Sequence, residues 1–261
     1  MCVILQCDKS IPKKDMLDNA NQKNPHGGGF AYIKDGLVHW EKGMHVNAKY
    51  IAKYVKKHKL TANNKLIVHF RIATHGEVNN MMCHPFPLGL DKNGQAVKNK
   101  TSGTTAIGVM FHNGVWEEYD QFAVKLAFNS HNIRIPDGDM SDSSIMAWCA
   151  SHKGVNFLEF TGEKVIVLSP NGITRFGEGW TDIDNIECSN DYFVPHEMDY
   201  WGSFSDNFSY RPKSVEAVKM SADDYEDTYA KEHQQAQQFY CQDELDYLDG
   251  IQGKRYEGEP L

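Results

Sequence analysis

The sequence of 261 residues has no long apolar run, no excess of basic charge and no Cys-x-x-Cys pair. No apolar stretch approaches the roughly 18 residues that a membrane-spanning helix needs, which argues against a membrane protein. A net charge of −8 disfavours a general nucleic-acid-binding protein. The sequence also contains no internal repeat, no phosphate-binding P-loop and no dinucleotide-binding fingerprint.

The six cysteines are scattered along the chain, in a pattern unlike a disulfide framework or a zinc site. The N-terminal apolar stretch is very short and is followed by charged residues, which is the wrong order for a secretory leader. We therefore expect a cytoplasmic protein with reduced thiols. Hydrophobic residues make up 41% of the chain and charged residues 24%, as in an ordinary globular protein.

Charge is distributed unevenly between two parts of the chain. Residues 196–261 contain 15 acidic and 6 basic residues, a balance of −9, whereas residues 1–195 contain 20 acidic and 21 basic residues, a balance of +1. The second part is also rich in Tyr and Gln and poor in aliphatic residues. We expect one folded domain over 1–195, followed by an acidic extension over 196–261 that is partly helical or disordered.

Apolar patterns within residues 1–195 predict a mixture of strands and helices. The Asp-Gly pair at 35–36 and the segment 169–172 predict two hairpins. A polar stretch follows the first strand up to Asn24, and residues 90–105, which are polar and contain Gly, are expected to form an excursion on the surface. Further strands are expected at 2–7, 65–74 and 106–111, and helices at 47–59, at 117–129 and from Ser141 onward. Because strands and helices do not alternate strictly, an α+β fold is favoured.

Cys2 is the first residue with candidate chemistry. Removal of Met1 would give Cys2 a free α-amine, whose ordinary pKa is roughly 7.7–8.0. Such an amine is able to act as a general base for the thiol of the same residue. A buried strand cysteine with no chemical role is the alternative interpretation.

Three further segments contain polar side chains next to predicted strand or helix ends. Residues 69–76, His-Phe-Arg-Ile-Ala-Thr-His-Gly, include Arg71, whose planar fork matches a carboxylate. Asn113 and Gly114 resemble a pair of oxyanion donors, although Asn-Gly is also a common turn. Asp142 is either a carboxylate for a ligand ammonium or an ordinary helix-terminal acid.

These features together resemble a known family. The segments that carry the resemblance are Cys2, residues 69–76, His84-Pro85-Phe86, His112-Asn113-Gly114, Ser141-Asp142 and the late Cys188-Ser189-Asn190. Over roughly residues 2–195 the chain resembles a class II glutamine amidotransferase domain, which is an N-terminal-nucleophile (Ntn) hydrolase. The resemblance implies a four-layer αββα sandwich with two mostly antiparallel sheets.

The resemblance also implies the chemistry of the site. Cys2 would be the nucleophile, and its α-amine would be the base. Asn113 and the Gly114 N–H would bind the oxyanion. Together they would hydrolyse the glutamine side-chain amide to glutamate and ammonia, through a γ-glutamyl thioester.

The resemblance further implies how glutamine would be held. Arg71, with Thr74 and His75, would bind its α-carboxylate, and Asp142 would bind its α-ammonium. No cofactor and no metal are implied. The ammonia would pass to a synthase on a separate chain, because too few residues follow position 195 for a second catalytic domain.

Two positions are assigned no chemical step. His84 and Gly28 are expected to be structural or to line the pocket. The glycine-rich stretch 24–29 departs from the family pattern, because His26 stands where many members have an aspartate.

Two other functions remain open from the sequence. The same pocket would suit another γ-glutamyl compound or a small amide. A metal-binding or non-catalytic scaffold is the other possibility, since His69, His75, His84 and His112 lie in neighbouring motifs, although their spacing does not match a helical zinc pair.

Overall fold

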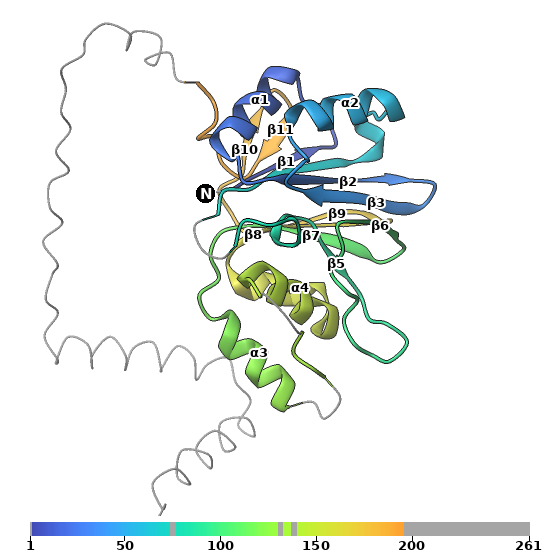
Figure 1. The fold of residues 1–261 in the computed structure, drawn as a ribbon, viewed down its shortest axis with the longest axis vertical. Coiled ribbons are helices and arrows are strands. Elements are labelled where there is room, and N and C mark those ends of the chain that lie inside the picture. The colour runs from blue at the N-terminus through green and yellow to red at the C-terminus, as the bar shows by residue number, and fades with distance from the viewer. Residues whose placement is uncertain (1, 74–76, 130–132, 137–139, 196–261) are drawn as a thin grey trace, which may run out of the picture. The chain divides into compact units, whose positions relative to one another are not determined.

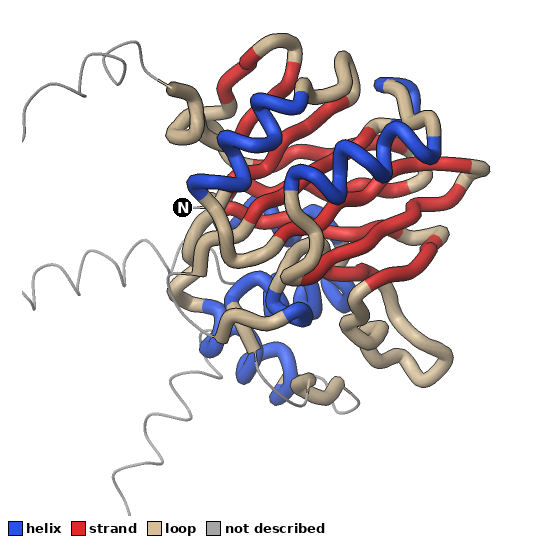
Figure 2. The backbone as a smooth tube through the Cα atoms, turned by 45° about the horizontal axis from the view of Figure 1, so that its top comes forward, coloured by secondary structure: helices blue, strands red, loops and turns tan. Residues whose placement is uncertain are grey.

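Two β-sheets and the helices that cover them form the part of the chain described by the computed structural model, residues 2–73, 77–129, 133–136 and 140–195 (Figures 1 and 2). These residues belong to one compact unit. The predicted extension, 196–261, lies outside the described residues. The strands are β1 (Val3–Cys7), β2 (Gly28–Lys34), β3 (Leu37–Gly43), β4 (Leu66–Phe70), β5 (Phe86–Leu88), β6 (Ser102–Thr105), β7 (Gly108–Asn113), β8 (Lys164–Ser169), β9 (Gly172–Phe176), β10 (Thr181–Ile183) and β11 (Ile186–Cys188). The α-helices are α1 (Lys14–Lys23), α2 (Ala48–His58), α3 (Tyr119–Phe128) and α4 (Asp142–Lys153), and the 3₁₀ helices are η1 (Ala62–Asn64), η2 (Asn80–Met82) and η3 (Val155–Thr161).

Both sheets are antiparallel. The larger sheet has the strand order β10-β11-β1-β4-β2-β3-β6, and the smaller sheet has the order β5-β7-β8-β9. The N-terminal strand β1 lies inside the larger sheet, between β11 and β4. The α+β class and the two antiparallel sheets predicted from the sequence are confirmed.

The elements are stacked in four layers, helix, sheet, sheet and helix (Figure 1). Helices α1 and α2 cover the outer face of the larger sheet, where Leu17 and Ile51 pack in one cluster with Val68 of β4. Helices α3 and α4 cover the smaller sheet through a second cluster. A third cluster, which includes Ile67 of β4 and Phe111 of β7, fills the space between the sheets. Burial of these apolar faces is the main force that holds the layers together.

Turn and cap residues fix the ends of several predicted elements. Asp35 and Gly36 both have positive φ, 53° and 73°, as a two-residue hairpin turn requires. The Asn47 side chain accepts a hydrogen bond from the first turn of α2. Ser141 caps α4 through a reciprocal capping box with Ser144. The two predicted hairpins and the helices at 47–59, at 117–129 and from Ser141 are thereby confirmed, with ends that differ by two residues or fewer.

One expected boundary is wrong, and two elements were not expected. Residues 14–23 form helix α1, which the sequence analysis missed because only Leu17 and Ala20 of this polar segment are buried. The strand expected over 65–74 ends at Phe70. The polar segment 90–105 includes the exposed edge strand β6, which pairs with β3. An edge strand needs little apolar surface, so its sequence carries a weak signal.

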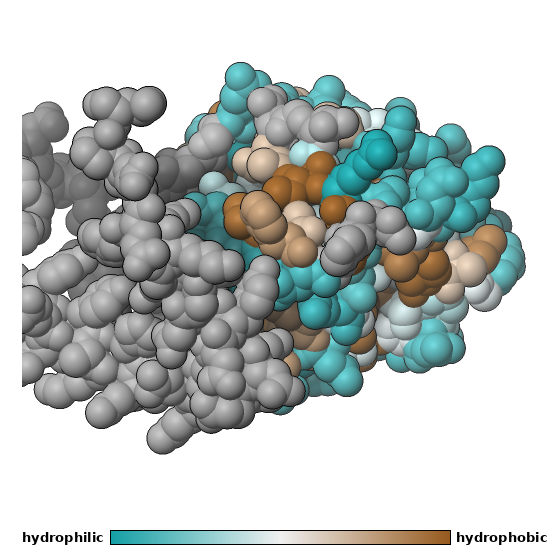
Figure 3. All heavy atoms as spheres, turned by 90° about the horizontal axis from the view of Figure 1, so that it is seen from below, coloured by the Kyte–Doolittle hydropathy of each residue, from teal (hydrophilic) through white to brown (hydrophobic). Residues whose placement is uncertain are grey.

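Helix α3 exposes apolar side chains as well as burying them. Ala123 and Leu126 are buried, whereas Phe122, Val124 and Phe128 are exposed. Apolar residues are visible among the hydrophilic ones on the face of the molecule that carries α3 and α4 (Figure 3). Within the described ranges, no helix has the length and apolar character needed to cross a membrane.

Candidate active site

The register of the larger sheet brings Cys2 next to Arg71. Val3 of β1 pairs with Phe70 of β4 in an antiparallel ladder, so the residues just before and just after this pair are neighbours. The Cys2 thiol donates to the Ile72 carbonyl oxygen at 3.5 Å. The Cys2 carbonyl accepts a hydrogen bond of 2.6 Å from Asn190 Nδ2, which fixes the backbone at the start of β1.

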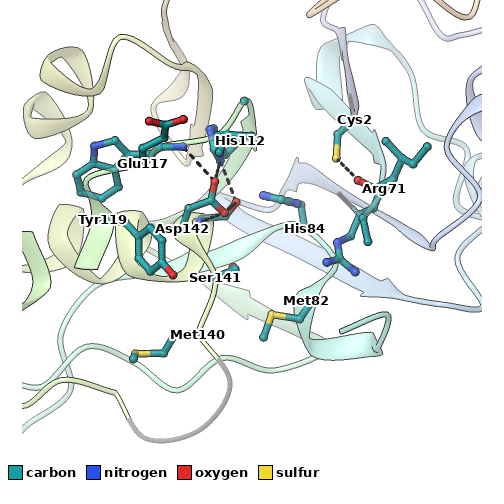
Figure 4. Close-up of a pocket in the computed structure, with 16 residues that line it drawn as sticks. Cys2, Arg71, Met82, His84, His112, Glu117, Tyr119, Met140, Ser141 and Asp142 are labelled. Carbon is teal, nitrogen blue, oxygen red and sulfur yellow. Dashed lines mark hydrogen bonds and ion pairs between the residues drawn. The ribbon is translucent and has the colours of Figure 1, made fainter. Parts of the chain in front are cut away.

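A cavity of about 510 Å³ opens beside Cys2, within the size range of small-molecule sites (Figure 4). Its lining includes five of the residues singled out from the sequence, namely Cys2, Arg71, His84, Gly114 and Asp142. These come from the start of β1, the end of β4, the segment before β5, the end of β7 and the start of α4. Thr74 and His75 lie outside the described residues.

The Cys2 thiol is only partly accessible to solvent. Burial raises the pKa of the thiol above its usual value, and the Asp142 carboxylate adds to this effect. The hydrogen bond to the Ile72 carbonyl and the Arg71 guanidinium act in the opposite direction. A thiol with a raised pKa is protonated at neutral pH, so nucleophilic attack by Cys2 would need a base that removes its proton.

Arg71 presents a mostly unused guanidinium to the cavity. Its side chain is 7% exposed, and Nη1 donates to the Glu77 carbonyl oxygen at 2.9 Å. Among the described residues, no carboxylate forms an ion pair with it. A buried guanidinium has five N–H donors and is costly without an anionic partner, so this side chain is suited to bind a ligand carboxylate.

Asp142 is held in place at the N-terminus of α4. Its Oδ2 accepts from the Trp116 backbone N–H at 3.2 Å, and its Oδ1 accepts from the Ser143 N–H at 2.7 Å. Ser143 Oγ lies 2.9 Å from Nδ1 of the buried His112. The helix dipole favours a carboxylate at this position. Asp142 is therefore a fixed anion on the cavity wall, opposite in charge to Arg71.

The two predicted oxyanion donors differ in position. Gly114 lines the cavity, whereas Asn113 is buried and does not. Asn113 Nδ2 donates to Ser189 Oγ at 2.8 Å, which uses one of its two N–H groups. An added Cβ at Gly114 would overlap Glu163 Oε2, so this carboxylate lies directly over the glycine. Ser189 also accepts from the Ile4 N–H at 2.9 Å and thereby ties β7 to the nucleophile strand.

The glycine-rich stretch has a structural role in the described residues. Gly28 does not line the cavity, and a Cβ there would lie 2.6 Å from the Val46 carbonyl oxygen. His26 accepts from the Ala73 N–H through Nδ1 at 3.0 Å. Its backbone N–H also donates to the Arg71 carbonyl. The stretch therefore holds the strand that carries Arg71.

Buried histidines lie between the two sheets. The rings of His69 and His84 are 4.2 Å apart between centroids, and His84 lies 6.4 Å from His112. Desolvation lowers the pKa of His69 to about 3 and that of His84 well below its usual range. No group of three or more His, Cys, Asp or Glu residues in the described ranges is arranged to hold a metal ion.

Several contacts of the site had no signal in the sequence. Ser143 and Trp116 orient Asp142, but a serine in a helix first turn and a tryptophan in a loop are common. Glu163 lies 3.5 Å from His112 Nε2 and over Gly114, although it is distant from both in the chain. Ser189, which bonds Asn113, and Asn190, which bonds the Cys2 carbonyl, belong to the segment 188–190 that the sequence pointed to.

Comparison of the chain with protein-family models and with curated proteins finds no match.

Proposed function

We propose that the domain is a glutaminase of the class II amidotransferase type, with the Ntn-hydrolase fold, and that Cys2 is its nucleophile after removal of Met1. The observation that carries the proposal is that Cys2, Arg71, Asp142 and Gly114 line a single cavity. Arg71 and Asp142 supply opposite charges for the two ends of an α-amino acid. The four layers, with the nucleophile at the start of an interior strand, agree with this fold.

The proposed reaction begins with proton transfer from the Cys2 thiol to its own α-amine. The sulfur then attacks the side-chain amide carbon of glutamine, and the oxyanion accepts a hydrogen bond from the Gly114 N–H, which lines the cavity. The Asn113 amide, which lies behind the cavity wall, is the second donor that the family resemblance implies. The C–N bond breaks as the amine returns the proton to the leaving ammonia, and a γ-glutamyl thioester remains. Water attacks the thioester and releases glutamate and the thiol.

The raised pKa of the Cys2 thiol supports this order of events. A preformed thiolate is disfavoured by burial, whereas an α-amine with an ordinary pKa of roughly 7.7–8.0 is able to accept the proton near neutral pH. Thr74 and His75 belong to the proposal through the sequence alone, as additional ligands of the substrate carboxylate.

Ammonia release from L-glutamine by the full-length protein tests the proposal. We expect turnover by the wild type and none by Cys2→Ala. Cys83→Ala is the matched control, because Cys83 is also buried beside the site but does not line the cavity. Retention of Met1 on the purified protein together with absence of turnover would refute the proposal.

A second candidate substrate is another γ-glutamyl amide. The cavity wall also includes Trp116, Tyr119 and Met140, which offer an apolar surface for a substituent on the amide nitrogen. Hydrolysis of a γ-glutamyl anilide more efficient than that of glutamine would favour this candidate. If glutamine is preferred, we propose that the ammonia passes to a synthase on a separate chain in the cytoplasm.

A further inference from the structure

His84 occupies a central position in the candidate active site. It lines the cavity, and Figure 4 shows its ring between Arg71 on one side and Asp142 on the other. Neither the sequence nor the family resemblance gives it a chemical step. Its side chain is only 4% exposed, so the groups near its ring decide what it does.

The ring nitrogens of His84 have no hydrogen-bond partner among the described residues. A buried polar atom without a hydrogen-bond partner destabilises the fold, because it has lost its bonds to water without replacement. The neighbouring His69 is in the same situation, but it does not line the cavity. His112 also lines the cavity and its Nε2 has no hydrogen-bond partner, but Nε2 lies 3.5 Å from Glu163 Oε2 and Nδ1 contacts Ser143 Oγ. His84 is therefore the cavity-lining ring with both nitrogens open to a ligand.

The protonation state of His84 limits what it is able to bind. Desolvation is the main cause of its lowered pKa, and the positive charges of Lys42 and Arg71 contribute to it. The ring is therefore neutral at physiological pH. A neutral imidazole has one N–H donor and one nitrogen acceptor.

For a bound α-amino acid, the cavity offers enough hydrogen-bond donors to the carboxylate but too few acceptors to the ammonium. Arg71 has five N–H groups, of which the Glu77 carbonyl uses one, so a carboxylate is well supplied. An ammonium has three N–H groups, but Asp142 already accepts from the Trp116 N–H and from Ser143. The head group would need another acceptor close to Asp142.

We propose that His84 is a substrate-binding residue whose acceptor nitrogen receives a hydrogen bond from the α-ammonium of the amino-acid substrate. His84 and Asp142 then share the recognition of this ammonium, and His84 contributes to selection of α-amino acids over simple amides. This inference rests on the proposed glutaminase function and adds a specificity-determining residue to it.

The test compares two substrates with two variants of the full-length protein. The substrates are L-glutamine and its des-amino analogue, which lacks only the α-ammonium. The variants are His84→Phe and the matched control His69→Phe. The control removes the other ring of the His69–His84 pair, which does not line the cavity. We expect His84→Phe to reduce kcat/KM for glutamine about 10- to 100-fold, as for loss of a hydrogen bond to a charged group. For the des-amino analogue we expect His84→Phe to reduce kcat/KM by less than about threefold. His69→Phe should change kcat/KM for the two substrates by the same factor.

Equal losses on both substrates in His84→Phe would overturn the inference, because a structural role does not distinguish them. If His84→Phe does not fold, the ¹⁵N shift of the His84 imidazole is followed in Cys2→Ala as glutamine is added. A shift of the acceptor nitrogen supports the inference, and an unchanged spectrum at saturating glutamine removes it. Absence of glutamine turnover by the wild type is a separate outcome, which removes the proposed function and this inference together.

Discussion

Lys42 provides a prediction that is independent of the proposed activity. Its side chain, on β3, is fully buried. Its Nζ donates to the Met81 carbonyl at 2.9 Å and to Asn99 Oδ1 at 2.7 Å, and it lies 4.0 Å from the centroid of the Phe86 ring. Among the described residues, no carboxylate pairs with it. Desolvation lowers its pKa from 10.5 to about 7.

This pKa makes the free energy of unfolding depend on pH. Between about pH 7 and 10.5 the unfolded chain holds a proton on Lys42 that the folded chain has released, so the stability of the fold rises with pH in this window. The slope from one such group is roughly 1.4 kcal/mol per pH unit. From about pH 7.5 to about pH 9.5 the contribution of Lys42 is roughly 2–3 kcal/mol, an upper value because the hydrogen bonds and the Phe86 ring favour the charged form.

The perturbation is Lys42→Met, which keeps the length of the side chain and removes the titration. Asn99 Oδ1 loses a donor in this variant, but that cost does not depend on pH. Urea unfolding gives the free energy of unfolding of the wild type and of Lys42→Met at about pH 7.5 and about pH 9.5. We expect the stability of Lys42→Met relative to the wild type to fall by roughly 2–3 kcal/mol over this interval. The control Lys49→Met, at an exposed position of α2, should follow the wild type. If the free energy of unfolding changes equally with pH in Lys42→Met and in the wild type, the pKa of Lys42 is not lowered by folding.

Three further predictions concern the cavity. Arg71→Ala should raise KM for glutamine by at least about 30-fold with a smaller effect on kcat, because the substrate carboxylate loses its partner, and unchanged steady-state kinetics would remove Arg71 from the pocket. Gly114→Ala should lower kcat by up to about 10-fold with little change in KM, because the new methyl group meets the Glu163 carboxylate beside the N–H donor and this side chain has to move, and an unchanged kcat would remove the Gly114 N–H from the oxyanion site. Iodoacetamide should alkylate Cys2 faster as the pH rises above neutrality, because burial raises the thiol pKa and the reactive thiolate forms more readily at higher pH, and a labelling rate by mass spectrometry that does not change with pH would contradict this.

Local features of the fold could be predicted from the sequence because their causes are local. The Asp35-Gly36 turn depends on residues that tolerate positive φ, and the caps at Asn47 and Ser141 depend on side chains that bond the adjacent helix turn. Helix α1 and strand β6 could not be predicted, since their stability comes from packing and pairing with segments distant in the chain. Leu17 and Ala20 alone do not produce a clear helical pattern.

Some features of the candidate site could be predicted from the sequence, and others could not. The proximity of Cys2 to Arg71 follows from the β1–β4 register, which the sequence does not specify, and it was expected only through the family resemblance. The position of Asp142 at a helix N-terminus was predictable from its cap. The approach of Glu163 to Gly114 was not, because it depends on how β7 and β8 place two loops side by side. Motifs therefore pointed to the candidate residues that line the cavity, whereas the contacts that orient them required the structure.

The central claim is that Cys2 becomes an N-terminal nucleophile in a pocket shaped for glutamine. The most direct measurement is the intact mass of the purified protein before and after treatment with a diazoketone analogue of glutamine, with the modified residue located by peptide sequencing. The account predicts loss of Met1 and a single adduct on Cys2, blocked by excess L-glutamine. A protein that retains Met1 and gains no adduct would contradict it.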